Sequence, residues 1–185
     1  MIQDVKKAFF YAPAQRDIYV DLPSEALGPG EEGMCGKLLQ SLYGTRDAAA
    51  NWAQAYTKVL LDIGFVKGAS SPCTFYHPLK NICLAVHGDD FVSAGSLSCL
   101  KWLDETLKGS FQIKTEILGE QDGLLKEARL LNRVISWRPE GLVWEPDPRH
   151  CELVWKDLGL DPATTNLLVT RGIRESGKSQ AGQKE

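Results

Sequence analysis

The chain has 185 residues, 43% of them hydrophobic, which is enough for one domain with a real core. Its formal net charge of -3 at pH 7 argues against strong nonspecific nucleic-acid binding by this chain alone. No apolar run approaches the roughly 18 residues of a membrane helix, and no signal peptide is visible. We therefore expect an intracellular protein of the cytoplasm or nucleus, without membrane contact.

The first half of the chain alternates predicted strands with one predicted helix. Residues 2–10 form a strand-like apolar run, residues 18–22 a short strand, and residues 23–33 a loop rich in Gly, Pro and Glu. Asp47 is a plausible helix N-cap, and apolar residues recur at helical spacing from there to Gly64. Residues 73–77 and 82–86 then read as a strand pair, followed by residues 91–94.

The second half continues the same mixture. Ser96 is expected to cap a second helix, whose apolar face is Leu100, Leu103 and Leu107. Residues 111–117 alternate as a strand, and residues 130–137 and 142–144 read as a hairpin around 139–141. Asp147 is followed by proline, which marks the start of a third helix. From about residue 171 the chain is polar and expected to be disordered. Strands with helices between them indicate a layered α+β fold.

The five cysteines are odd in number and lack Cys-x-x-Cys spacing, which argues against a zinc site or a disulfide framework. Buried free thiols are the expected state. The tryptophans at 137, 144 and 155 are most simply core residues.

Three acidic residues lie in or beside strand-like segments. Asp4 lies inside the first apolar run, and Asp89 and Asp90 form the tip of a hairpin pattern between residues 82–86 and 91–92. Acids in such segments are usually paired or bind metal. An isolated Asp-Asp pair is more often a solvated turn. All three acids together indicate a cation site, and oxygen ligands favour magnesium or manganese over zinc.

Three sequence blocks, taken in order, resemble a known family. They are Asp-Val-Lys-Lys-Ala-Phe at 4–9, Leu-Tyr-Gly at 42–44 followed by an Ala-rich stretch and Trp52, and His-Gly-Asp-Asp at 87–90. They resemble the reverse transcriptases of copia-type retrotransposons, over residues 1 to about 160. The resemblance implies an RNA-directed DNA polymerase that acts by two-metal nucleotidyl transfer within a parent polyprotein.

The resemblance also implies an architecture. Residues 1–120 would be a polymerase palm, an α+β fold with an antiparallel sheet and helices packed on one face. Residues 121–160 would hold a primer-grip-like hairpin and the first thumb helix. The remaining residues, 161–185, are assigned to a disordered tail because of their polar composition.

By the same resemblance, the acids would hold two Mg²⁺ or Mn²⁺ ions. Asp4 and Asp90 would bridge both ions, Asp89 would be a more variable third ligand, and the backbone carbonyl of Val5 would bind the nucleotide-side ion.

Other residues would contact the nucleotide or the primer. Phe9 is either the gate that excludes a ribose 2′-OH or a core residue, and these roles are compatible. Tyr43 and Gly44 either anchor a loop or, by the resemblance, lie under the incoming nucleotide, where glycine lets the backbone approach the ligand. Lys114 would protonate the leaving pyrophosphate, or is simply a surface lysine.

Leu131 and Asn132 fall at the primer-grip position. The partners of the complete enzyme would be an RNA/DNA template-primer and a dNTP, with the fingers, thumb and RNase H segments of the polyprotein. Because those segments lie outside the chain, we expect no polymerisation by this chain alone.

The chain departs from the family pattern at four positions. His87 stands for Tyr, Asp47 and Ala49 for Gln and Pro, and Asn132 for Gly. The alternative is therefore a degenerate, catalytically silent retroelement remnant that acts at most as a structural or binding domain. A phosphate-binding or signalling α/β domain with a chance acidic turn is a third and weaker alternative.

Overall fold

The computed structural model describes residues 1–146 and 148–159, which form two compact units, Met1–Leu125 and the part from Lys126 onward. Each unit is described by itself. Among the described residues there are three α-helices and antiparallel sheets, so the mixed α and β composition expected from the sequence is confirmed.

A six-stranded antiparallel sheet organises the first unit. In spatial order its strands are β4 (Val66–Lys67), β5 (Thr74–His77), β6 (Ile82–His87), β7 (Asp90–Ala94), β1 (Ile2–Val5) and β8 (Ile113–Glu116). Burial alternates along these strands: in β6 every second residue from Ile82 is buried, and those between are exposed. Period-two burial means that one face of the sheet is covered and the other is open.

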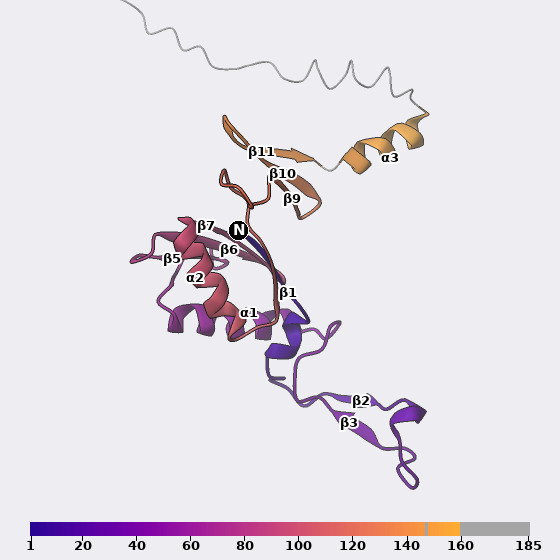
Figure 1. Cartoon of the computed structure of the whole chain (residues 1–185). Helices are drawn as coiled ribbons and strands as arrows, with labels where there is room; N and C mark the ends of the chain where they lie inside the picture. Colours follow the sequence, from indigo (N-terminus) through magenta and orange to yellow (C-terminus); the bar gives the residue numbers. More distant parts are fainter. Residues whose placement is uncertain (147, 160–185) are drawn as a thin grey trace, which may run out of the picture. The chain divides into compact units, whose positions relative to one another are not determined.

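Two helices cover that face (Figure 1). They are α1 (Ala48–Asp62), which ends before Gly64, and α2 (Leu97–Lys108), which follows Ser96. Both were expected from helical spacing, and Leu100, Leu103 and Leu107 form the buried face of α2 as predicted. Trp52 and Leu60 of α1 complete the core against the sheet. The apolar side chains of helices and sheet thus exclude water from one side only.

A two-stranded ribbon extends from the first unit. It pairs β2 (Tyr19–Asp21) with β3 (Cys35–Lys37), and the 3-10 helix η2 (Ser24–Ala26) lies in the connection. No residue from 13 to 40 is buried. The Lys37 ammonium contacts the Asp17 carboxylate at 2.6 Å on one face of the ribbon.

The second unit is a three-stranded antiparallel sheet followed by a helix. Its elements are β9 (Glu127–Leu130), β10 (Arg133–Arg138), β11 (Gly141–Pro146) and α3 (Pro148–Leu158). The expected hairpin around residues 139–141 is the β10–β11 pair. The expected N-cap at Asp147 and the expected tail lie outside the described residues.

The first predicted strand is wrong beyond Val5. The chain leaves β1 because Lys7 takes a left-handed conformation (φ 54°), and the 3-10 helix η1 (Ala8–Tyr11) follows. Ala8 and Ala12 are completely buried, and their small side chains let this turn pack into the core. The apolar run at 8–12 therefore reflects burial of a tight turn rather than of a strand.

The strand expected over residues 130–137 is present as β10 from Arg133 onward, but a turn separates it from Leu130, which belongs to β9. Leu131 and Asn132 both have positive φ (49° and 58°) and form a two-residue connection between β9 and β10. Trp144 is not a core residue: it is 56% exposed on β11.

The expected burial of the thiols is not found either. Cys35, Cys73 and Cys83 are exposed and Cys99 is half-buried. Cys83 shows the reason, because it points to the open face in the alternation of β6. None of the described helices is long and apolar enough to span a membrane.

Candidate active site

Asp4 and Asp90 face each other across the β1–β7 pair. The Val5 amide donates to the Asp89 carbonyl at 3.0 Å, which makes Val5 and Asp89 a hydrogen-bonded pair. Hydrogen-bonded and open pairs alternate in antiparallel strands, so the Asp4–Asp90 pair is an open one, with Cα atoms about 4.5 Å apart. Side chains of such a pair point to the same face.

That face is the open one. Gln3 and Val5, on either side of Asp4, are completely buried beneath the sheet, whereas Asp4 is exposed and Asp90 half-buried. The pleat of β1 therefore turns the Asp4 carboxylate away from the core, beside that of Asp90.

Asp89 lies in the turn rather than in a strand. His87 pairs with Asp90, so Gly88 and Asp89 form a two-residue connection between β6 and β7. Gly88 has φ 62°, as the first position of a type II′ turn requires. The predicted hairpin with acids at its tip is thus present, with one acid in the turn and the other at the start of β7.

The pKa of Asp90 is raised above its ordinary value. Partial burial is the main cause, followed by the negative charges of Asp89 and Asp4, while the nearby His87 acts in the opposite direction. Electrostatically, this arrangement favours a bound proton or a bound cation between the carboxylates.

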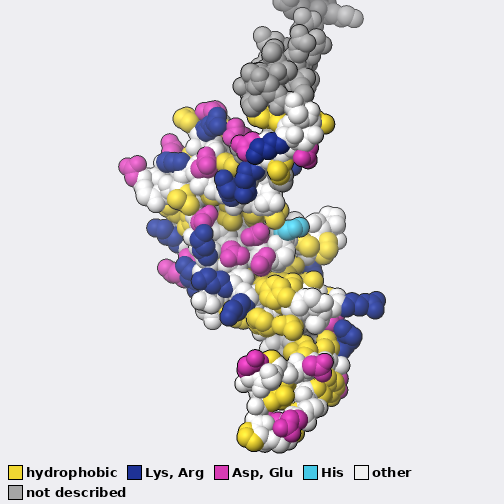
Figure 2. Space-filling view, turned by 90° about the vertical axis from the view of Figure 1, so that its right-hand side faces the viewer, with side chains coloured by type: hydrophobic (Ala, Val, Ile, Leu, Met, Phe, Trp, Pro, Cys, Tyr) yellow, Lys and Arg dark blue, Asp and Glu magenta, His cyan; other side chains and the backbone are white. Residues whose placement is uncertain are grey.

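Lys114 lies opposite Asp4 on β8. Its ammonium contacts Glu116 at 2.8 Å, and the side chain is 64% exposed. The pKa of Lys114 is raised, first by the hydrogen bond from its ammonium to Glu116 and then by the charges of Glu116 and Asp4. Figure 2 shows acidic and basic side chains as neighbours on the surface. A role of Lys114 toward a leaving group stays a prediction.

The part of the chain that the structure describes contains no group of three or more His, Cys, Asp or Glu residues placed to hold a metal ion. Asp4 and Asp90 face each other directly, and a shared cation site that also includes Asp89 stays a prediction. These two oxygen-bearing side chains on adjacent strands fit a hard divalent cation, and they are the residues that would hold it. The Val5 side chain has no ligand atom and the residue is completely buried, so binding of an ion by its backbone carbonyl stays a prediction.

The structure brings Phe9 and Tyr43 together, although they are far apart in sequence. Their ring centroids are 4.3 Å apart, and the Phe10 ring lies 5.9 Å from Tyr43. Gly44 has φ 88°, and a Cβ there would meet nothing within 4 Å. Glycine at position 44 is therefore explained by this left-handed backbone conformation, and not by close contact with another part of the chain.

Leu131 and Asn132 are exposed at the β9–β10 turn of the second unit. Their primer-binding role stays a prediction.

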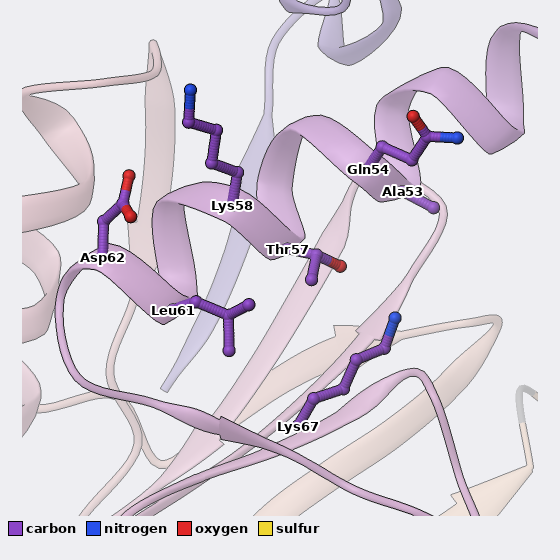
Figure 3. A pocket seen from close by; sticks show the side chains of 7 residues that line it. All are labelled: Ala53, Gln54, Thr57, Lys58, Leu61, Asp62 and Lys67. Carbon is purple, nitrogen blue, oxygen red and sulfur yellow. The ribbon is translucent and has the colours of Figure 1, made fainter.

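A hollow of about 340 Å³ lies between α1 and β4, with Lys58, Asp62 and Lys67 as its charged side chains (Figure 3). None of the predicted site residues lines it. It is therefore separate from the acidic pair.

Asp47 occupies the N-cap position of α1, but its side chain makes no cap hydrogen bond. Arg16 instead binds both carboxylate oxygens, at 3.0 and 2.8 Å, and this hydrogen bonding lowers the Asp47 pKa to about 2. Asp47 therefore lies at the predicted N-cap position, but the predicted hydrogen bond from its side chain to the helix is absent. Nothing in the sequence pattern pointed to Arg16, because its partner lies 31 residues away.

A second contact was also missed. The Trp52 indole N–H donates to the Gly88 carbonyl at 2.8 Å, which ties α1 to the turn that carries Asp89. The spacing of Trp52 indicated a core residue, which it is, but spacing carries no information about where the indole nitrogen points.

Comparisons with known proteins agree with the order of the sequence blocks. A family model described as reverse transcriptase (RNA-dependent DNA polymerase) matches residues 2–123. The chain is 28% identical over 155 residues to the retrovirus-related Pol polyprotein from transposon TNT 1-94 of Nicotiana tabacum, which covers 82% of this chain and 11% of that protein. It is 31% identical over 122 residues to the transposon Ty1-NL2 Gag-Pol polyprotein of Saccharomyces cerevisiae, which covers 64% of this chain and 7% of that protein. The chain thus spans a small part of the length of these relatives.

Proposed function

This chain belongs to the reverse transcriptase (RNA-dependent DNA polymerase) family, and from that premise we propose that it is the palm-centred part of a copia-type retrotransposon reverse transcriptase. The observation that carries the proposal is the pairing of Asp4 with Asp90 on the open face of the sheet. Under the proposal, residues 1–120 are the palm, and residues 121–160 hold the primer-grip-like hairpin and the start of the thumb.

The proposed chemistry is nucleotidyl transfer to a primer 3′-oxygen. Asp4 and Asp90 would hold two Mg²⁺ or Mn²⁺ ions from adjacent strands, and Asp89 and the Val5 carbonyl would complete the binding. When bound, the ions supply positive charge to the attacking and leaving oxygens. A hydrogen-bonded sheet is a suitable support, because misplacement of reacting groups by ~1 Å can cost about a hundredfold in rate.

The remaining residues are proposed to position the substrates. Phe9, Tyr43 and Gly44 contact the incoming nucleotide, and Lys114 faces its leaving group. The close contact of the Phe9 and Tyr43 rings supports a shared surface for these two residues.

The partners are proposed to lie in a longer polypeptide, since both relatives are polyproteins. Leu131 and Asn132 contact the primer strand of an RNA/DNA template-primer, and other segments of the polyprotein supply fingers, thumb and RNase H. A net charge of -3 supports this division, because the chain alone has little electrostatic hold on a duplex. The proposed location is the cytoplasm or nucleus.

A catalytically silent remnant is the second candidate. It is favoured by the lack, among the described residues, of a three-ligand acidic group, and by the engagement of Asp47 with Arg16. In that case the fold would persist as a structural or binding domain without turnover.

RNA-templated primer extension distinguishes the two candidates. The assay uses poly(rA)/oligo(dT), dTTP and Mn²⁺, and compares this chain with a longer polypeptide of its polyprotein, each with and without Asp90→Asn. We expect extension by the longer polypeptide only, abolished by the substitution. A folded longer polypeptide that extends no primer would favour the silent remnant.

A further inference from the structure

The largest fully buried side chain of the described residues, Trp52, is bonded to the turn that carries Asp89. It is 1% exposed on α1, and its indole N–H donates to the Gly88 carbonyl at 2.8 Å. This bond joins residues 36 positions apart, from the helix beneath the sheet to the tip of the β6–β7 hairpin.

Two consecutive carbonyl groups of this turn are held from different elements. The Gly88 carbonyl accepts from Trp52, and the Asp89 carbonyl accepts from the Val5 amide at 3.0 Å. These carbonyls belong to the peptide groups on either side of Asp89. Since a peptide group is planar, fixing both planes fixes the backbone dihedral angles of Asp89 and the direction in which Asp90 starts β7.

The Trp52 ring is itself immobilised by aromatic neighbours. Tyr56 and Phe111 meet it edge-on, with centroids 5.4 and 5.1 Å away, and Phe91 stacks on it at 6.2 Å. Phe91 directly follows Asp90 on β7 and points to the covered face. The indole N–H therefore cannot swing away from the turn without disturbing the core.

We propose that Trp52 is a positioning residue, which sets the placement of the Asp89 and Asp90 carboxylates by fixing the Gly88 carbonyl from beneath the sheet. The inference rests on the proposed function insofar as these carboxylates bind a divalent cation. Trp52 does not touch the reactants. It acts only through the backbone of the turn.

The test replaces the indole N–H by sulfur, with benzothienylalanine at position 52, so that ring size and packing are kept. Trp52→Phe removes the same donor with a natural residue, but it also leaves a cavity in the core, so it serves as a second variant and not as the matched one. The matched control is the same sulfur replacement at Trp102, whose ring packs on His77 and Lys80.

The first measurement needs no metal. Amide hydrogen exchange is followed at Val5, which bonds to Asp89, and at Lys6, which bonds to Gln112 on the other side of β1. We expect exchange at Val5 to accelerate about tenfold in the position-52 variants while that of Lys6 stays unchanged. A merely structural role would accelerate both amides equally, and equal acceleration or none would overturn the proposal.

The second measurement is Mn²⁺ affinity by electron paramagnetic resonance. We expect the position-52 variants to bind Mn²⁺ about 10- to 100-fold more weakly, as is typical when a group that orients metal ligands is removed, and the position-102 control to bind like the native chain. Native affinity in a variant with a loosened Val5 amide would overturn the link to the cation. If the native chain binds no Mn²⁺, the proposed metal function fails, and the exchange result alone decides whether Trp52 positions the turn.

Discussion

Asp90→Asn should stabilise the metal-free protein, although it removes a proposed catalytic group. Asp90 lies directly opposite Asp4 and next to Asp89, and burial together with these charges raises its pKa. Asparagine has nearly the same shape and no charge, so it removes both the repulsion and the cost of burying an ion.

The size of the effect follows from the cross-strand geometry. Directly opposed side-chain pairs in a sheet are worth about 0.2–1 kcal/mol, and like charges in such a pair destabilise the sheet. Asp89 adds a second repulsion. We take about 1 kcal/mol as the gain in the free energy of unfolding, which for a chain of this length raises Tm by roughly 2–4 °C.

The gain must depend on pH in a defined direction. Because burial and the neighbouring charges raise the folded-state pKa of Asp90 above its ordinary value, the native protein loses stability as pH rises through that folded pKa. Below the pKa that Asp90 has in the unfolded chain, its carboxyl is neutral in both the folded and the unfolded state. The variant and the native chain should then be equally stable. The difference should grow above the folded pKa and reach its full value near neutral pH.

The assay is urea unfolding in the presence of EDTA, monitored by circular dichroism, at pH values from below the unfolded-state pKa of Asp90 to neutral pH. The control is Asp21→Asn, a strand aspartate whose cross-strand partner is Cys35 rather than an acid. A variant that is less stable than the native chain at neutral pH, or a gain that persists in acid, would refute the proposed repulsion.

Three further predictions concern other parts of the chain. Millimolar Mn²⁺ should raise Tm of the native chain but not of Asp4→Asn, because the ion binds only the folded state; equal shifts in differential scanning fluorimetry would contradict this. Leu131→Asn combined with Asn132→Gly should stabilise the second unit by about 1 kcal/mol, because both positions have positive φ and Asn-Gly suits a type I′ turn. Urea unfolding measures this as a higher midpoint, and an unchanged midpoint would count against the prediction. The native protein should lose stability as pH falls from about 4 to about 2, because Arg16 lowers the pKa of Asp47 to about 2 in the folded state. Arg16→Gln should remove this loss, and thermal melts across that pH range, with Asp17→Asn as a control, measure it.

The elements with one-sided burial were predictable from the sequence. Leu100, Leu103 and Leu107 recur at helical spacing because a single face of α2 contacts the sheet. The strands β5 and β6 alternate for the same reason. In each case the sequence pattern records which side of the element meets water.

The unpredicted features are those in which non-glycine residues adopt unusual backbone conformations. Lys7 and Leu131 have positive φ, and neither residue type is typical of such positions, so the end of β1 and the β9–β10 turn carried no signal. The strand β3, which the sequence did not predict, is only three residues long and includes a glycine.

The acidic pair was predictable only in part. The presence of Asp4 and Asp90 in strand-like segments could be read from the sequence, but their facing positions depend on the register between β1 and β7. Register depends on hydrogen bonds between segments about 90 residues apart, for which the local pattern has no information. The position of Asp89 at the hairpin tip was predicted by the local pattern, and it depends on the pairing of β6 with β7, which are adjacent in the sequence.

The two-residue turn at Gly88 and Asp89 has an evolutionary consequence. One residue inserted between His87 and Phe91, if taken up by a shift of β7, would rotate Asp90 to the covered face and bring a core side chain to the surface. Insertions and deletions here should therefore be rarer among functional members of the lineage than substitutions such as a histidine at position 87. A gap in this turn would mark an inactivated copy more reliably than a changed side chain.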